Sequence, residues 1–186
     1  MSQIADELPS ILVSASEELL RETGFCPRPQ VHMFAEDMDN PYVGYMTCRY
    51  FYRGADAAEA IADLGLMPSV LAATRLIVLW EDCDLRTALE MRDESFATGL
   101  VVMDAQLDRH TLHWYPFAVE AGEQSSLGVP TVIPRWGAPA RFEGAELLAP
   151  VAILLRTWRE FRRDDIQQTA IDLQKNGYEL HWAHPA

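Results

Sequence analysis

Two short, uninterrupted apolar runs constrain the fold of this chain more than any other feature. Residues 76–80 read LIVLW and residues 99–103 read GLVVM. A strand with one face in water alternates apolar and polar residues, whereas a run that is apolar throughout is typical of a strand buried on both faces. Both runs therefore predict central strands of a sheet. A short helix predicted over 84–92 lies between them, and if it is a crossover the two strands are parallel neighbours.

The remaining pattern predicts hairpins and helices around these two strands. Residues 31–36 and 42–52 are rich in strand formers and are separated by the turn residues DMDNP, which predicts a hairpin. Further strands are expected at 110–117 and 178–182, and helices at 3–22 and 56–65. Because hairpins and crossovers both occur, we expect an α+β or mixed α/β fold with a central mixed sheet of about five or six strands and about three or four helices.

Two further segments are predicted in the C-terminal half, an irregular one and a helical one. Residues 118–150 contain four prolines and four glycines, so the sequence predicts an irregular Gly/Pro-rich arm that packs through its aromatic residues. A long helix is expected from about 151 to 175, because apolar residues recur there at helical spacing. At 186 residues, the chain is the size of one domain, and we expect a single globular domain over 1–186.

Composition and charge narrow the functional classes. The net charge of −13 should repel nucleic acid and anionic lipid, so we expect neither a nucleic-acid nor a membrane partner. Cys26, Cys48 and Cys83 form no C-x-x-C pair, which is typical of reduced thiols in a cytosolic protein. The N-terminus lacks the basic start and apolar stretch of a signal peptide. Lysine is nearly absent, which fits a high-GC bacterial genome, and we expect a cytoplasmic bacterial protein.

Three acidic residues form the sharpest chemical candidate. Glu81 and Asp82 follow the first apolar run, and Asp104 follows the second. Parallel strands would bring these carboxylates together beyond their C-terminal ends, where sheets commonly hold ligands. Clustered carboxylates suit a hard cation such as Mg²⁺ or Mn²⁺. The alternative interpretation is that the acids end their strands only because they are solvated, since no known metal motif is matched.

An arginine cluster suggests a different site. Residues 1–108 hold nineteen acids and seven arginines, whereas residues 109–186 hold nine acids and eight basic residues. Arg156, Arg159 and Arg163 would share one face of the predicted C-terminal helix. Guanidinium groups bind carboxylates and phosphates through a planar fork of donors, so this face is a candidate partner-binding or phosphate-binding surface. A solvated face with local ion pairs is the alternative.

These observations favour a non-enzymatic interaction or regulatory domain. The Arg-rich helix and the 118–150 arm would form its contact surface, with a protein partner or a second copy of the chain, and no cofactor is expected. The competing hypothesis is a metal-assisted hydrolase or phosphoryl-transfer enzyme in which Glu81, Asp82 and Asp104 hold Mg²⁺ or Mn²⁺. A small-ligand binding module with a pocket under the arm is a third possibility. Neither type of glycine-rich phosphate loop occurs in the chain, which disfavours ATP or NAD binding of the usual kinds.

Overall fold

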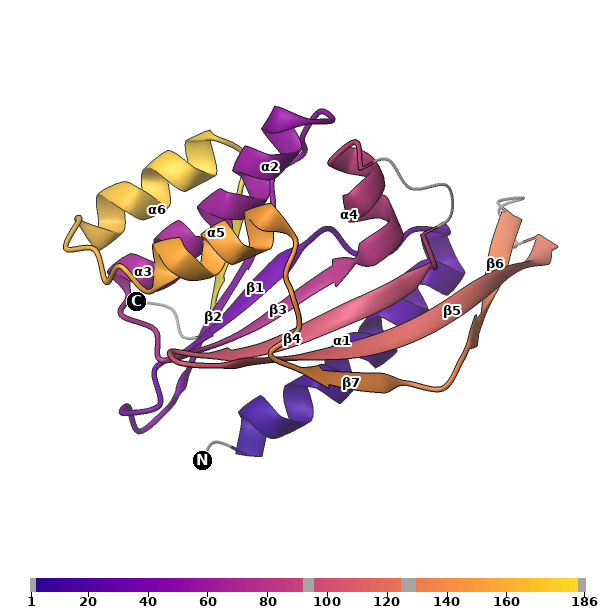
Figure 1. The fold of residues 1–186 in the computed structure, drawn as a ribbon, viewed down its shortest axis with the longest axis horizontal. Helices are drawn as coiled ribbons and strands as arrows, with labels where there is room; N and C mark the ends of the chain where they lie inside the picture. Colours follow the sequence, from indigo (N-terminus) through magenta and orange to yellow (C-terminus); the bar gives the residue numbers. More distant parts are fainter. Residues whose placement is uncertain (1–2, 92–95, 125–129, 184–186) are drawn as a thin grey trace.

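The computed structural model describes residues 3–91, 96–124 and 130–183, which form three layers. One sheet lies between helix α1 and a layer that contains the other helices (Figure 1). The mixed α+β class predicted from the sequence is confirmed.

The helices are α1 (Gln3–Thr23), α2 (Ala55–Ala62), α3 (Leu66–Val70), α4 (Asp82–Ala88), α5 (Ala149–Trp158) and α6 (Ile166–Lys175), with a 3-10 turn at Asp63–Gly65. The strands are β1 (Gln30–Phe34), β2 (Tyr42–Thr47), β3 (Arg75–Glu81), β4 (Gly99–Gln106), β5 (His110–Gln124), β6 (Pro130–Trp136), β7 (Ala140–Glu143) and β8 (Glu179–Trp182).

The sheet differs from the predicted one in size and in strand direction. Its order is β6-β5-β4-β3-β1-β2-β8, with β7 paired to β5, so it holds eight strands and not five or six. Every strand pair among the described residues is antiparallel. The predicted mixed sheet is therefore wrong, and so is the number of helices. The connection between β3 and β4 reverses the chain and is not a crossover between parallel strands.

Strands β3 and β4 lie at the centre, as the two apolar runs predict. All residues of β3 are buried. Alternate side chains of β3 enter two separate cores, because successive residues of a strand point to opposite faces. Leu76 and Val78 pack with α2, α3 and α5 in the larger core. Ile77 and Leu79 pack with Ala5, Leu8 and Leu12 of α1 in the smaller one.

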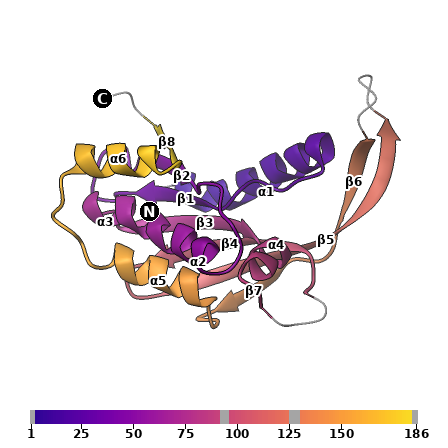
Figure 2. The ribbon, with the colours of Figure 1, turned by 90° about the horizontal axis from the view of Figure 1, so that it is seen from above.

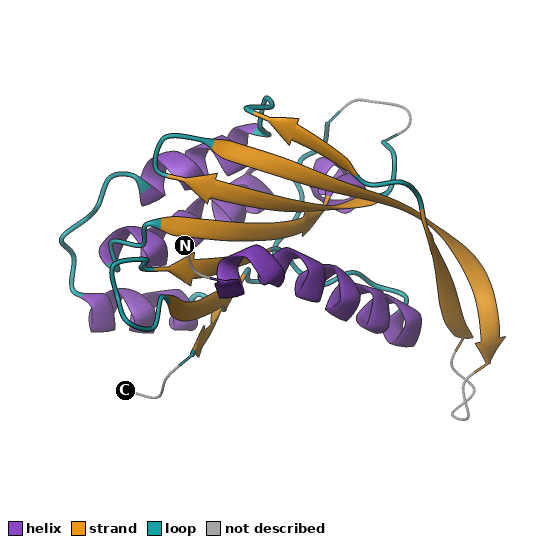
Figure 3. Ribbon diagram, turned by 90° about the horizontal axis from the view of Figure 1, so that it is seen from below, coloured by secondary structure: helices purple, strands orange, loops and turns teal. Residues whose placement is uncertain are grey.

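The predicted irregular arm at 118–150 consists largely of strands. β5 continues without interruption to Gln124 and pairs with β6 through the register Phe117↔Trp136 to Gln124↔Pro130. β7 then pairs with the first half of β5. The β5–β6 hairpin bends away from the main sheet toward the side on which α1 lies (Figures 2 and 3). Prolines are tolerated in β6 because it is an edge strand, whose outward N–H groups need no partner in the sheet.

The long helix predicted over 151–175 is two helices. α5 ends at Trp158, and Phe161 has a φ of 47°, which takes the chain out of the helical path. α6 begins after Asp165, whose carboxylate accepts a hydrogen bond from the Gln168 N–H at 2.8 Å. An aspartate at this position satisfies an N–H group that has no partner within the helix. The apolar periodicity continues across the break, which is why it indicated one helix.

His32 is a buried polar residue of β1, opposite Ile77 and on the face of the sheet that carries the smaller core. It is only 4% exposed, and its Nδ1 lies 3.0 Å from the Tyr42 hydroxyl. Its ring stacks on Tyr45 with a centroid distance of 5.0 Å. Burial disfavours the charged imidazolium and lowers the pKa of His32 from 6.5 to about 4. The folded protein therefore holds this side chain neutral at pH values where the unfolded chain binds a proton.

Acid should destabilise the fold through His32. Because the unfolded chain takes up the proton first, the contribution of His32 is complete above about pH 6.5 and is lost as the pH falls to about 4. The expected loss is up to about 3 kcal/mol. Urea denaturation of the wild type and of His32→Phe across this pH range measures the loss. The carboxylates titrate in both proteins, so the difference between the two pH profiles reports the contribution of His32. Parallel pH profiles for the two proteins would contradict the assignment.

Candidate functional site

The three acids predicted to bind a metal do not converge. β3 and β4 are antiparallel, with Glu81 opposite Leu100 and Asp104 opposite Ile77. Four residues along a strand correspond to about 13 Å. Glu81 and Asp104 therefore lie at different ends of their strand pair, and the parallel arrangement on which the prediction rested is wrong. Among the described residues, no group of three or more His, Cys, Asp or Glu side chains is placed to hold a metal ion.

Glu81 has a local structural role. Its Oε2 accepts a hydrogen bond from the Asp84 N–H at 2.5 Å, which caps the start of α4. Its Oε1 accepts a hydrogen bond from the Gly99 N–H at 2.9 Å, which joins this cap to the start of β4. Burial raises the pKa of Glu81, and these backbone hydrogen bonds act in the opposite direction. The helix predicted to begin at residue 84 begins at Asp82, and the side chain of Glu81 is the acceptor at its start.

Asp104 belongs to an ion cluster under α1. Its two carboxylate oxygens accept hydrogen bonds from Nε and Nη2 of Arg75, at 2.9 and 2.8 Å. Arg75 also contacts Asp6 of α1 at 3.1 Å and Glu36 at 3.6 Å. The Arg75 side chain is only 5% exposed. This cluster ties the first turns of α1 to the central strands.

The three arginines predicted to share one helical face lie in two different parts of the structure. Arg156 lies on α5, whereas Arg159 and Arg163 lie beyond its end. Arg159 donates a hydrogen bond to the Gln106 carbonyl at 3.0 Å, and its guanidinium lies 5.6 Å from the centre of the Trp158 ring. Arg156 and Arg163 are exposed. The break between α5 and α6 therefore removes the common helical face, although the two exposed arginines remain available to a partner.

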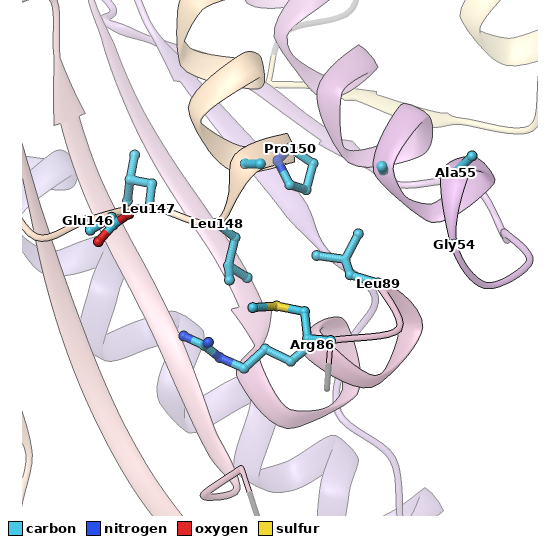
Figure 4. Close-up of a pocket in the computed structure, with 11 residues that line it drawn as sticks. Gly54, Ala55, Arg86, Leu89, Glu146, Leu147, Leu148 and Pro150 are labelled. Atoms are coloured by element: carbon cyan, nitrogen blue, oxygen red, sulfur yellow. The ribbon is translucent and has the colours of Figure 1, made fainter. Parts of the chain in front are cut away.

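A concave site that the sequence did not indicate lies on the helical side of the sheet. Three adjoining hollows, with volumes of about 790, 160 and 300 Å³, share Arg86. We refer to them together as the cleft. The first hollow lies between the starts of α2 and α5 and the end of α4 (Figure 4). The second and third lie against the sheet and are lined by the aromatic residues Trp80, Phe96, Trp114 and Phe142.

The walls of the first hollow are mainly aliphatic. Ala55 and Ala58 come from α2, Leu89 follows α4, and Leu147 and Leu148 precede α5. The three leucines also pack against the larger core, so core packing constrains this part of the wall. Segments far apart in the chain thus meet at one apolar surface. Part of the segment predicted as a contact arm contributes to this surface, because Leu147 and Leu148 lie within 118–150.

Arg86 and Asp82 supply the polar centre of the cleft. Arg86 Nε donates a hydrogen bond to Asp82 Oδ2 at 2.6 Å, and Trp80 Nε1 donates one to Asp82 Oδ1 at 3.2 Å. The Arg86 guanidinium lies 5.3 Å from the centre of the Phe96 ring. Asp82 was predicted as a metal ligand, but here it orients an arginine. Their i, i+4 spacing is typical of an ion pair on a helix, but the helix predicted over 84–92 began two residues too late to include Asp82.

Comparisons with known proteins assign neither a family nor a function to the chain. The chain matches no protein-family model, and neither a curated protein nor a solved structure shows significant similarity to it. Within the described ranges, no helix combines the length and the apolar character needed to cross a membrane. The geometry of the cleft and the chemistry of its walls are therefore the basis for the function proposed below.

Proposed function

We propose that this protein is a non-enzymatic binding module whose cleft holds a small, mainly apolar molecule. The supporting observation is the first hollow, with a volume of about 790 Å³. Small-molecule sites in proteins typically have volumes of about 300 to 1,000 Å³ and combine apolar walls with a few polar groups. The aliphatic walls around Arg86 and Glu146 fit this description.

The construction of the walls also supports binding by a preformed site. Leu89, Leu147 and Leu148 contact the larger core, and Leu112 and Trp114 are packed against it from the sheet. A ligand that enters a site whose walls are already packed loses less binding free energy to the ordering of side chains. The cleft needs no large rearrangement to present its apolar surface.

A protein partner at Arg156, Arg159 and Arg163 has weaker support. Arg159 already donates to the Gln106 carbonyl, and only Arg156 and Arg163 are well exposed. Exposed ion pairs contribute little binding free energy, at most about 1 kcal/mol each. The metal-assisted alternative lacks the convergence of Glu81 and Asp104 on which it depended. The cleft is therefore the site on which we base the proposed function.

Filling the first hollow should abolish ligand binding. Ala58 lines it from α2, so Ala58→Trp places an indole in the volume that the ligand would occupy. Fluorescence titration with the neutral apolar dye N-phenyl-1-naphthylamine should show saturable binding of one dye per wild-type chain. We expect the affinity of Ala58→Trp to be weaker by about tenfold or more, which corresponds to about 1.4 kcal/mol.

The matched control is Ala15→Trp. Ala15 is an exposed alanine on α1, on the other face of the sheet. This variant adds the same side chain to the surface and should bind the dye as the wild type does. Absence of saturable binding to the wild type, or equal affinities of Ala58→Trp and wild type, would contradict the proposed function.

A further inference from the structure

We propose that the molecule held in the cleft carries a single carboxylate, which binds to the terminal nitrogens of Arg86. This inference rests on the proposed function, because it assigns the polar end of the same ligand. Its basis is the position of one arginine at the junction of the three hollows. Figure 4 shows the Arg86 side chain extending from α4 toward the side of the cleft that carries Glu146, Leu147 and Leu148.

Arg86 is oriented by the protein. Its Nε donates to Asp82 Oδ2, while the other oxygen of that carboxylate accepts from the Trp80 indole. The ring of Phe96 lies 5.3 Å from the guanidinium carbon. These contacts hold the plane of the guanidinium group. A planar group held in this way loses less conformational entropy when it binds a ligand.

Among the described residues, the terminal nitrogens of Arg86 are open to a ligand. Arginine has five N–H donors, and the hydrogen bond from Arg86 to Asp82 uses the one on Nε. Within the described residues, we find no hydrogen bond from Nη1 or Nη2. The Arg86 side chain is 31% exposed, so these nitrogens are within reach of solvent or of a bound molecule. Two parallel N–H donors match the two oxygens of a carboxylate.

The neighbouring acids disfavour a ligand with two negative charges. Asp82 is held by Arg86 and Trp80, and Glu146 is an exposed acid at the edge of the cleft. A phosphate monoester, with nearly two negative charges, would be repelled by these two acids more strongly than a monocarboxylate. The aliphatic walls of the first hollow then accommodate the rest of the molecule. A monocarboxylate with an aliphatic tail matches both the Arg86 guanidinium and the aliphatic walls of the first hollow.

Three probes with ten carbons each and different head groups test which head group the cleft prefers. Decanoate, 1-decanol and decylamine would each be titrated against the bound naphthylamine dye at about pH 7.5, where the acid and the amine are charged. We expect decanoate to displace the dye at a concentration at least about tenfold lower than decanol does, because a charge-assisted pair is added. Equal potency of decanoate and decanol, or greater potency of decylamine, would overturn the carboxylate assignment.

Variants of Arg86 test whether this residue causes the preference for decanoate over decanol. Arg86→Met keeps the apolar stem but removes the guanidinium, so it should remove the preference for decanoate over decanol. Arg86→Lys keeps the charge but not the fork, and should retain part of the preference. Arg21→Met is the matched control, because Arg21 also pairs with an acid four residues earlier and lies on α1. A full decanoate preference in Arg86→Met would refute the inference.

The two proposals fail in different ways. If the wild type does not bind the naphthylamine dye in a saturable manner, the cleft is not an apolar binding site and the proposed function is wrong. If the dye binds but the head group makes no difference, the binding site stands and the role of Arg86 is wrong. Circular dichroism and the melting temperature of each variant show whether it is folded, and Arg86→Lys retains the positive charge beside Asp82 if Arg86→Met does not fold.

Discussion

Replacing Trp158 by alanine is expected to lower the free energy of unfolding by about 3 to 5 kcal/mol. Trp158 is 0% exposed and is among the largest fully buried side chains of the described structure. It lies at the end of α5 and packs in the larger core, so its removal leaves a large cavity between the helices and the sheet. Its Nε1 also donates a hydrogen bond to the Ala73 carbonyl at 2.7 Å.

Urea denaturation of Trp158→Ala and Trp158→Phe separates the two contributions. Trp158→Phe keeps much of the packing but leaves the Ala73 carbonyl without this donor, which should cost about 1 to 3 kcal/mol. Trp182→Ala is the control, because Trp182 is 43% exposed on the edge strand β8. A loss in Trp158→Ala no greater than that in Trp182→Ala would show that α5 does not anchor the helical layer.

Replacing Arg75 by methionine is expected to cost about 3 to 5 kcal/mol, because it leaves the acids around it without their buried counter-charge. The Arg75 side chain is 5% exposed, and that of Asp104 is 23% exposed. The acids Asp6 and Glu36 are more accessible to water, so most of the effect should come from Asp104. The variant should also loosen α1, since Arg75 links Asp6 of that helix to β4.

The comparison variant for Arg75 is Arg135→Met. Arg135 pairs with Glu120 on the β5–β6 hairpin, and these side chains are 63% and 57% exposed. An exposed pair of this kind contributes at most about 1 kcal/mol. The double variant Arg75→Met/Asp104→Leu should recover part of the lost stability, because it removes the unpaired acid as well. If Arg75→Met were no more destabilised than Arg135→Met in chemical denaturation, the ion cluster would not be structural.

Strand positions could be predicted from the sequence, but strand directions could not. The runs at 76–80 and 99–103 required burial on both faces, and the structure places them in β3 and β4 at the centre of the sheet. The segment that joins them is long enough either for a crossover or for a reversal, because a crossover needs about a dozen residues or more. Their direction follows from packing with β1 and β5, which the local sequence does not encode.

The 118–150 segment shows a second limit. Its prolines and glycines indicated an irregular arm, because these residues disfavour the interior of a sheet. They do not exclude edge strands, and β6 and β7 each pair with β5 alone in the described structure. Likewise, the periodicity over 151–175 predicted one helix, although Asp165 carried the signal for a new helix start. In both segments the local pattern did not determine how the elements connect.

The sequence by itself determined which segments had to be buried, the mixed α+β class and the acidic character of the surface. These properties follow from residue type and short-range periodicity. The tertiary structure alone decided that Asp104 meets Arg75, that Glu81 caps α4, and that Ala58, Arg86 and Leu148 line one cleft. The residues of that cleft come from elements far apart in the chain, and their proximity results from how the helices and the sheet pack.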